Sequence, residues 1–210
     1  MKIKKNDFIE LEYTARIKQT NQIFDLTDEK LAKENNLYNS NARYGPVIIC
    51  VEQHDLVPGL DHALIDKEPG NYIIELDPKE AFGMRNSKLI KIIPISNFKK
   101  KEIYPYPGLQ VNRDNMLGIV RSVSSGRVIV DFNHPLAGKD LVYNIKINKV
   151  IDGNKEKINA LLKMLMNIND ADIEIKDDVA AISLKKGMPE EAQEEFKNML
   201  SRTVPAVKNA

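Results

Sequence analysis

The segment from Asp131 to Ile147, DFNHPLAGKDLVYNIKI, constrains the fold of this chain more than any other. Its second half alternates with a period of two, which is typical of a half-buried strand, and the apolar face carries Leu141, Tyr143, Ile145 and Ile147. We therefore expect a hairpin whose second strand directs Tyr143 into a core or a pocket. The connecting turn carries Leu136 and Ala137, although turns favour polar residues. Such a turn suits contact with an apolar ligand, and the alternative is a buried turn without a role.

The motif N-H-P-L-A-G-x-x-L-x-Y/F-N-x-x-I in this segment resembles the last hairpin of the FK506-binding-protein (FKBP) type peptidyl-prolyl isomerases, in their SlyD-like and archaeal branch. Further pieces of the family pattern follow in order along the chain, at 7–13, 23–25, 55–64 and 81–83, so the resemblance covers roughly residues 1 to 150. It implies an α+β fold, with an FKBP-like antiparallel half-barrel sheet wrapped on a short helix. A strand at 7–16 and a helix at 61–67 fit this fold.

Turn-rich interruptions suggest further domains. Strand-like pieces at 90–93, 110–111, 116–122 and 127–130 are separated by their own turns, which predicts a small all-β domain inserted at 86–130. The isomerase domain would then be 1–85 and 131–151. In the resembled branch an insert-in-flap domain occupies this place, and the resemblance implies that it binds unfolded polypeptide and acts as a chaperone.

The pattern changes after Gly153. Apolar residues at helical spacing, two short strands and a helix opened by Pro189 predict a C-terminal α-β-β-α module at 152–210. We expect its amphipathic helices to pack on each other rather than on a partner. A homodimer through this module is left open.

Rotation about a prolyl bond requires no nucleophile, metal or cofactor, only relief of a resonance barrier of about 18 to 20 kcal/mol. A dry apolar pocket favours the twisted amide, because the planar amide is the more polar form. The resemblance assigns such a pocket to nine residues: Tyr13, Phe24, Asp25, Val57, Leu60, Phe82, Leu136, Ala137 and Tyr143. The backbone N–H of Val57 would bind a substrate carbonyl. Without the resemblance, the aromatic residues would be interpreted as ordinary core and Asp25 as a turn cap.

Two positions depart from the commoner family pattern. Phe82 stands where many members have tyrosine, and Leu60 stands where the drug-binding members have tryptophan. Both residues keep the pocket apolar, so isomerisation is expected to survive, whereas tight macrolide binding is not assured. The rival hypothesis is a holdase whose isomerase cleft has decayed.

Composition excludes several other classes. With 31 Lys and Arg against 30 Asp and Glu, the net charge of +1 provides no global field for nucleic acid or an anionic membrane. Lys99, Lys100 and Lys101 with nearby arginines would suit nucleic acid or an acidic client, but a solvated turn is the simpler interpretation. The partners expected are therefore unfolded or proline-containing polypeptides, with neither nucleic acid nor membrane.

The remaining sequence features agree with a cytoplasmic protein. The single cysteine, Cys50, lies in an apolar run where a buried thiol is expected, which fits a reducing compartment. No apolar run reaches the ~18 residues of a spanning helix, and the N-terminus lacks a signal-peptide core. His54, His62 and His134 lie in different motifs without metal-ligand spacing, so we expect no metal site.

Overall fold

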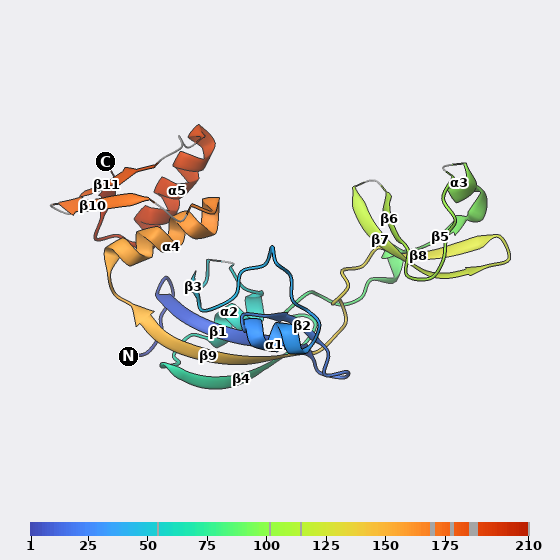
Figure 1. The fold of residues 1–210 in the computed structure, drawn as a ribbon, viewed down its shortest axis with the longest axis horizontal. Helices are drawn as coiled ribbons and strands as arrows, with labels where there is room; N and C mark the ends of the chain where they lie inside the picture. Colours follow the sequence, from blue (N-terminus) through green and yellow to red (C-terminus); the bar gives the residue numbers. More distant parts are fainter. Residues whose placement is uncertain are drawn as a thin grey trace. The chain divides into compact units, whose positions relative to one another are not determined.

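The computed structural model describes residues 1–53, 55–100, 102–113, 115–168, 171–176, 179–184 and 189–209 (Figure 1). It divides into two compact units, one formed by 1–76 with 140–210 and the other by 77–139. The second unit contains the expected insert, 86–130, together with residues on both sides of it. Residues 152–210 group with the first unit, where the sequence pattern had predicted a separate module.

The first unit is built on a five-stranded antiparallel sheet. Its strands are β1 (Phe8–Ile17), β2 (Ile23–Leu26), β3 (Val47–Cys50), β4 (Gly70–Leu76) and β9 (Leu141–Ile151), in the order β2-β1-β9-β4, with β3 pairing β1. The alternation predicted for 141–147 holds, because the odd-numbered residues of this stretch are buried. Helix α1 spans Glu29–Glu34, and α2 spans Pro58–Ala63 and contacts β4.

Helix α2 begins three residues before the predicted start at Asp61. Pro58 occupies its first turn, where the fixed φ of proline suits a helix and the missing N–H is not needed. The chain leaves the helical path at Asp66, which has a φ of 63° and donates its backbone N–H to the carbonyl of Ile3 at 2.9 Å. The helix is therefore short, and its residue Leu60 is buried.

A bulge in β9 gives the sheet a second buried surface. Leu11 pairs with Ile147 and Glu10 with Lys149, so Asn148 is the extra residue on β9. Beyond it the phase of the strand is reversed, and Ile151 lies beside Phe8 on the face that is otherwise polar. Phe8 therefore lies on the face of β1 opposite to that of Leu11.

The C-terminal part of the first unit covers this surface. It comprises α4 (Asn154–Met166), β10 (Asp172–Lys176), β11 (Val179–Ser183), α5 (Glu190–Thr203) and β12 (Lys208–Asn209), with β10 antiparallel and β12 parallel to β11. Leu161 and Phe196 are buried in one cluster with Phe8, Cys50 and Ile151. The helices thus bury apolar residues against their own strands and against one end of the first sheet.

The second unit contains an antiparallel sheet of four strands in the order β5-β8-β7-β6. These are β5 (Ile90–Pro94), β6 (Gln110–Arg113), β7 (Met116–Ser124) and β8 (Arg127–Asp131), all close to the predicted positions. A 3₁₀ turn, η1 (Ser87–Leu89), and a short helix, α3 (Ile95–Lys99), were not predicted, so the insert is not purely β. Pro94 ends β5, and α3 places Phe98 in the core, 7% exposed.

The hairpin predicted over Asp131–Ile147 is wrong. Strand β8 pairs with β5 on one edge and β7 on the other, in the sheet of the second unit. Strand β9 pairs with β1 and β4 in the first unit. Because both edges of β8 are occupied, it has no backbone groups left to pair with β9, and 132–140 is a connection between two sheets.

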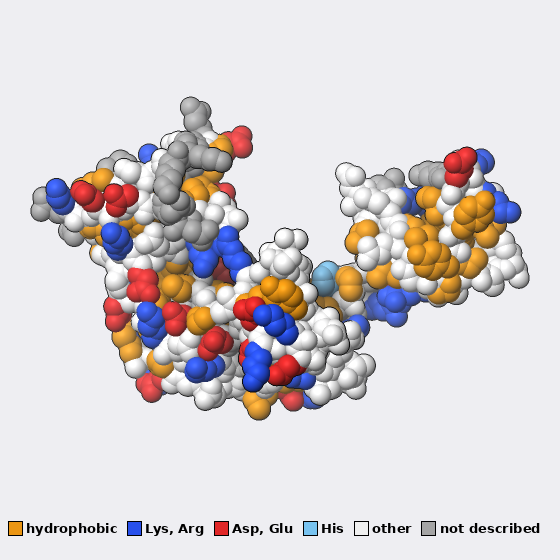
Figure 2. Space-filling view, viewed as in Figure 1, with side chains coloured by type: hydrophobic (Ala, Val, Ile, Leu, Met, Phe, Trp, Pro, Cys, Tyr) orange, Lys and Arg blue, Asp and Glu red, His pale blue; other side chains and the backbone are white. Residues whose placement is uncertain are grey.

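Charged side chains of both signs are interspersed on the visible face of the first unit, whereas the insert shows a broad hydrophobic area and few acidic groups (Figure 2). Among the described residues, no helix is both long and apolar enough to cross a membrane.

Candidate active site

Two adjacent strands of the first unit bring Tyr13 and Asp25 together. Tyr13 lies on β1 and Asp25 on β2, and the two strands are antiparallel neighbours. The Tyr13 hydroxyl donates a hydrogen bond to Asp25 Oδ2 at 2.8 Å. Asp25 therefore fixes the orientation of an aromatic ring, while its own side chain remains exposed.

A bulge in β2 directs two consecutive side chains toward the same place. Asp25 pairs with Ala15 and Ile23 with Arg16, so Phe24 is the extra residue. In a regular strand neighbouring side chains point to opposite faces, and a bulge relaxes this rule. Phe24 and Asp25 can therefore both reach the residues on the inner face of the sheet.

Tyr143 is the centre of the aromatic cluster. Its ring lies 6.3 Å from that of Tyr13, at 49°, and 6.0 Å from that of Phe24, edge to face at 87°. Edge-to-face pairs at such separations are favourable beyond the area that they bury, by about 0.5 to 1.5 kcal/mol. Tyr143 is 5% exposed and Tyr13 is half-buried, so the cluster closes at Tyr143 and opens at Tyr13.

The electrostatics of the cluster keep both phenols protonated. Burial, followed by the charge of Asp25 and the hydrogen bond to it, raises the pKa of Tyr13. Burial, followed by the charge of Asp25, raises the pKa of Tyr143 to about 12. The two hydroxyls are therefore neutral near pH 7, and that of Tyr13 donates its hydrogen bond to Asp25.

Thr27 supports the backbone of Tyr13 and was not predicted as a site residue. The backbone N–H of Tyr13 donates to Thr27 Oγ1 at 2.9 Å, and Thr27 Oγ1 donates to the Tyr13 carbonyl at 3.3 Å. The Thr27 carbonyl accepts from the Gly45 backbone N–H at 2.7 Å, and Thr27 is 4% exposed. The next residue, Asp28, has a different role: its side chain caps α1 by accepting from the backbone N–H of Leu31.

Val57 and Leu60 flank the start of α2. Val57 is the N-cap residue, with φ −61° and ψ 143°, and its carbonyl accepts the backbone N–H of Leu60 at 2.9 Å. Within the part of the chain that the structure describes, the Val57 backbone N–H makes no hydrogen bond. Leu60 is 1% exposed, so its side chain belongs to the core. Val57 thus offers a hydrogen-bond donor, its backbone N–H, that any non-proline residue at this position would also provide.

Phe82, Leu136 and Ala137 lie in the second unit. The ring of Phe82 stacks on that of His134, with centroids 4.3 Å apart and planes at 4°. Leu136 and Ala137 follow in a turn in which the Ala137 backbone N–H donates to the His134 carbonyl at 2.9 Å. His134 was set aside as a metal ligand, and its role as an aromatic partner was missed. The structure thus brings these three predicted residues together around one imidazole.

The nine predicted residues therefore form two groups. Tyr13, Phe24, Asp25 and Tyr143 form one cluster in the first unit, where Val57 and Leu60 also lie. Among the residues that the structure describes, no group of three or more His, Cys, Asp or Glu is arranged to hold a metal ion. The chemistry that these residues support is the binding of an apolar, uncharged group.

Known proteins identify the family. Residues 91–136 match the family model described as FKBP26, IF domain. The chain is 30% identical over 155 residues to a short-type peptidyl-prolyl cis-trans isomerase of Methanocaldococcus jannaschii, covering 73% of this chain and 98% of that protein. It is 32% identical over 108 residues to a probable FKBP-type 16 kDa peptidyl-prolyl cis-trans isomerase of Pseudomonas fluorescens, covering 49% and 71%.

A third relative belongs to the predicted branch. The chain is 28% identical over 167 residues to the FKBP-type peptidyl-prolyl cis-trans isomerase SlyD of Treponema pallidum, covering 77% of this chain and 86% of that protein. These matches confirm the predicted resemblance and the enzyme class. The chain belongs to the FKBP-type, SlyD-like family of peptidyl-prolyl cis-trans isomerases.

Proposed function

We propose that the enzyme accelerates proline-limited folding by binding a twisted prolyl amide at the cluster of Tyr13, Phe24, Asp25 and Tyr143. The carrying observation is the arrangement of three aromatic rings around the Tyr13–Asp25 hydrogen bond of 2.8 Å. The rings supply an apolar surface and no charged group other than Asp25. Because the twisted amide is less polar than the planar one, this surface stabilises the transition state more than the ground state.

The proposed mechanism needs only differential binding. Each ~1.4 kcal/mol by which the site favours the twisted amide over the planar one raises the rate tenfold. The backbone N–H of Val57 binds a substrate carbonyl and so fixes one side of the amide. The neutral hydroxyl of Tyr143 limits the polarity of the surface. No proton transfer, nucleophile or metal takes part in this step. For Phe82, Leu136 and Ala137, the family resemblance remains the basis of the assignment.

A proline-peptide assay tests the proposal. Asp25→Ala removes the acceptor that orients Tyr13 and is expected to lower kcat/KM for a short prolyl peptide by about tenfold, which corresponds to ~1.4 kcal/mol. Asp28→Ala, which changes a neighbouring exposed carboxylate and removes only the cap of α1, is the matched control and should leave kcat/KM near the parent value. Equal activity of Asp25→Ala and the parent would contradict the proposed site.

We further propose that the insert holds unfolded polypeptide while the prolyl bond rotates. Large apolar side chains on it are exposed to solvent, among them Ile92 at 63%, Leu117 at 59% and Tyr104 at 85%. Exposed apolar surface of this kind is typical of a protein interaction site. Binding at a position remote from the reacting bond raises the local concentration of the client.

Surface variants separate this role from peptide isomerisation. Ile92→Ser combined with Leu117→Ser should slow the catalysed refolding of a proline-limited protein, with kcat/KM for short peptides unchanged. Ile73→Ser on β4 is the matched control, because Ile73 is 73% exposed and lies in the first unit. If the double variant refolds the protein as fast as the parent does, the insert does not hold the client.

A holdase with little isomerase activity is the second candidate. Phe82 favours it, since this residue lacks the hydroxyl that many family members have at this position. Phe82→Tyr should restore the hydroxyl. A chain that shows no peptide isomerisation either before or after this change, but suppresses aggregation of an unfolded protein, would be a holdase.

A further inference from the structure

Charge is distributed unevenly between the insert and the rest of the chain. Residues 86–130 contain eight Lys and Arg and two Asp and Glu, a net charge of +6, although the whole chain carries only +1. The remaining residues therefore carry a net charge of −5. In Figure 2 the visible face of the insert shows a broad orange area with scattered blue and little red, whereas red and blue are mixed across the first unit.

The insert also has a groove with an apolar interior. It has a volume of about 620 Å³ and lies between α3 and β6. Its lining comprises the apolar residues Ile93, Phe98, Ile103, Leu109 and Val111, the amides Asn97, Gln110 and Asn112, and the cations Lys100 and Arg113. Pockets of 300 to 1,000 Å³ with mostly apolar walls and a few polar groups are typical of binding sites. This groove, called the insert groove below, has room for more than one side chain.

The charged groups of the insert groove have one sign. Lys100 and Arg113 are both exposed, and none of the described residues that line the groove is acidic. Within the described part of the second unit, the salt bridges join Asp131 to Arg85 and Arg121, and Lys100 takes part in none. A bound group of opposite charge would therefore not have to displace an internal partner of Lys100.

We infer that the insert groove selects apolar client segments flanked by acidic residues. This inference rests on the proposed polypeptide-holding role and adds to it the class of sequence that is held. One or two bulky client side chains would fill the apolar interior, and carboxylates beside them would pair with Lys100 and Arg113. The net charge of +6 on the insert steers such segments toward the groove, and the net charge of −5 on the remaining residues disfavours their binding elsewhere.

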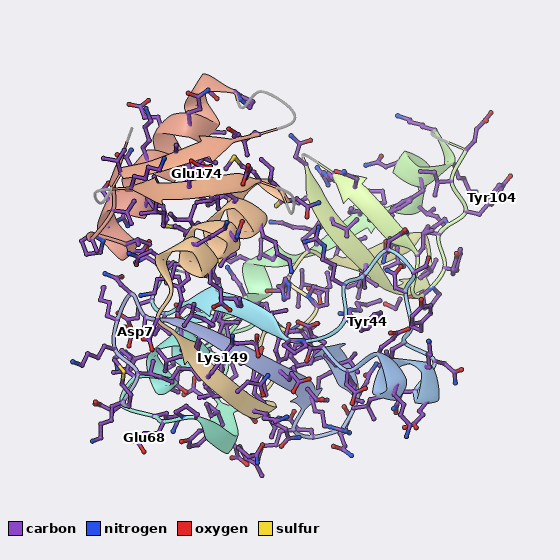
Figure 3. All side chains as sticks on the ribbon, turned by 60° about the vertical axis from the view of Figure 1, so that its left-hand side comes forward. Asp7, Tyr44, Glu68, Tyr104, Lys149 and Glu174 are labelled. Carbon is purple, nitrogen blue, oxygen red and sulfur yellow. The ribbon has the colours of Figure 1, made fainter. Side chains whose placement is uncertain are left out.

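The shape of the groove favours a polypeptide over nucleic acid. Single-stranded nucleic acid is bound by exposed aromatic rings that stack on bases, along a cationic track. The aromatic residue of the groove, Phe98, is 7% exposed and is part of the insert core. Tyr104, labelled in Figure 3, projects from the insert and does not line the groove. The interior is therefore suited to aliphatic side chains.

Peptide binding to the full chain tests the inference. Three fluorescein-labelled peptides share one apolar core and carry flanking glutamates, glutamines or lysines, and their Kd values are measured by fluorescence anisotropy. The glutamate-flanked peptide is expected to bind about three- to tenfold more tightly than the glutamine-flanked one, as for one or two partly exposed ion pairs. This preference should shrink between about 50 and 500 mM NaCl, because salt screens exposed charges.

Matched variants locate the preference. Lys100→Gln with Arg113→Gln should equalise the glutamate- and glutamine-flanked peptides while the core still binds. Lys91→Gln with Arg127→Gln removes the same charge from the insert outside the groove, and should retain most of the preference. An equal loss in both double variants would show a general field and overturn selection by the groove.

The remaining outcomes distinguish a failure of charge selection from a failure of the proposed polypeptide-holding role. If all three peptides bind equally, selection by charge fails and the holding role stands. If none binds, the holding role fails as well. If single-stranded DNA binds the full chain more tightly than the glutamate-flanked peptide and displaces it, the insert serves a polyanion, and the inference is overturned.

Discussion

Arg85 Nη2 lies 2.6 Å from Oδ2 of Asp131, a carboxylate that is only 2% exposed. Arg121 reaches the same oxygen with its Nη2 at 3.2 Å, and it does so from a bulge in β7, where Val120 pairs with Val130 and Ser122 with Ile129. Asn133 donates to the other oxygen of Asp131 from its backbone N–H and its side chain, at 3.0 and 2.8 Å. Asp131 thus links three segments of the second unit.

This carboxylate should make the second unit sensitive to acid. Burial acts to raise the pKa of Asp131, but hydrogen bonds from Asn133 and then Arg85 outweigh it and lower the pKa to about 2. Because the folded pKa lies below the unfolded value of ~3.9, the stabilisation is complete above about pH 4 and is lost as the pH falls toward 2. It amounts to roughly 2 kcal/mol. Thermal unfolding between pH 2 and 6, followed by circular dichroism, measures it.

Asp131→Asn tests the assignment of that pH dependence. The variant keeps the shape of the side chain, removes its charge and should flatten the change in stability between pH 4 and 2. Asp172→Asn, an exposed carboxylate on β10, is the control and should leave the profile of the parent unchanged. A parent-like profile in Asp131→Asn would show that other groups govern the acid sensitivity.

The isomerase activity should be independent of pH across the neutral and mildly alkaline range. The pKa values of Tyr13 and Tyr143 are both raised, that of Tyr143 to about 12, against ~10 for an unperturbed tyrosine. Both hydroxyls therefore stay protonated, and kcat/KM for a prolyl peptide should be flat from about pH 6 to 9. An inflection in this range that disappears in Tyr143→Phe would contradict the proposed state of the cluster.

Thr27→Val should weaken both stability and activity. The change keeps the volume of a residue that is 4% exposed but removes the hydroxyl that bonds both backbone groups of Tyr13. Leaving the Tyr13 N–H without this partner should cost about 1 to 3 kcal/mol of unfolding free energy. Because the backbone of Tyr13 loses a hydrogen-bonding partner, kcat/KM for a prolyl peptide should also fall. The pH at which the tyrosine absorbance of the folded protein changes should stay that of the parent.

Urea denaturation and the peptide assay measure these effects. Thr20→Val, at an exposed turn position, is the matched control for both readouts. A Thr27→Val variant with lowered stability and the full activity of the parent would limit Thr27 to a structural role.

The C-terminal helices and the first sheet should unfold together. Phe8 in β1 is fully buried and Phe196 in α5 is 5% exposed, and both belong to one cluster. Replacing either with alanine should lower the unfolding free energy by about 3 to 5 kcal/mol. The two effects should not add in the double variant, because both residues pack in one buried cluster. Two separate urea transitions, each affected by one substitution, would contradict a shared core.

The elements that are easiest to predict from sequence have their cause within the element itself. The alternation of β9 and the turn at Ser125 and Gly126, both of which have positive φ, are local patterns, and the structure contains both. The partner of a strand is not local. Nothing in the apolar run of β8 indicates that β5 and β7 occupy both its edges, and the hairpin prediction failed for this reason.

The residues of the candidate site that belong to the family motifs could be predicted from the sequence. Residues that act through a backbone contact or a ring contact could not. Tyr13, Phe24, Asp25 and Tyr143 follow from the motifs, and the structure brings them together. Thr27 acts through the main chain of Tyr13, and His134 acts as a flat ring beneath Phe82. Neither role has a signature in residue type or spacing, since both depend on which segments meet in space.

The extra residue at Asn148 determines which face of the sheet the end of β9 contributes to. The bulge reverses the alternation of side chains along β9. Its apolar residues face one side of the sheet up to Ile147, and Ile151 faces the other side. If β9 instead continued without the bulge, Asn148 would pair with Glu10, and Ile151 would face the inner side, away from Phe8. The bulge thus lets this strand contribute to two apolar clusters although its sequence gains one residue, and deletion of Asn148 alone should leave Ile151 paired with Phe8 and the C-terminal helices attached.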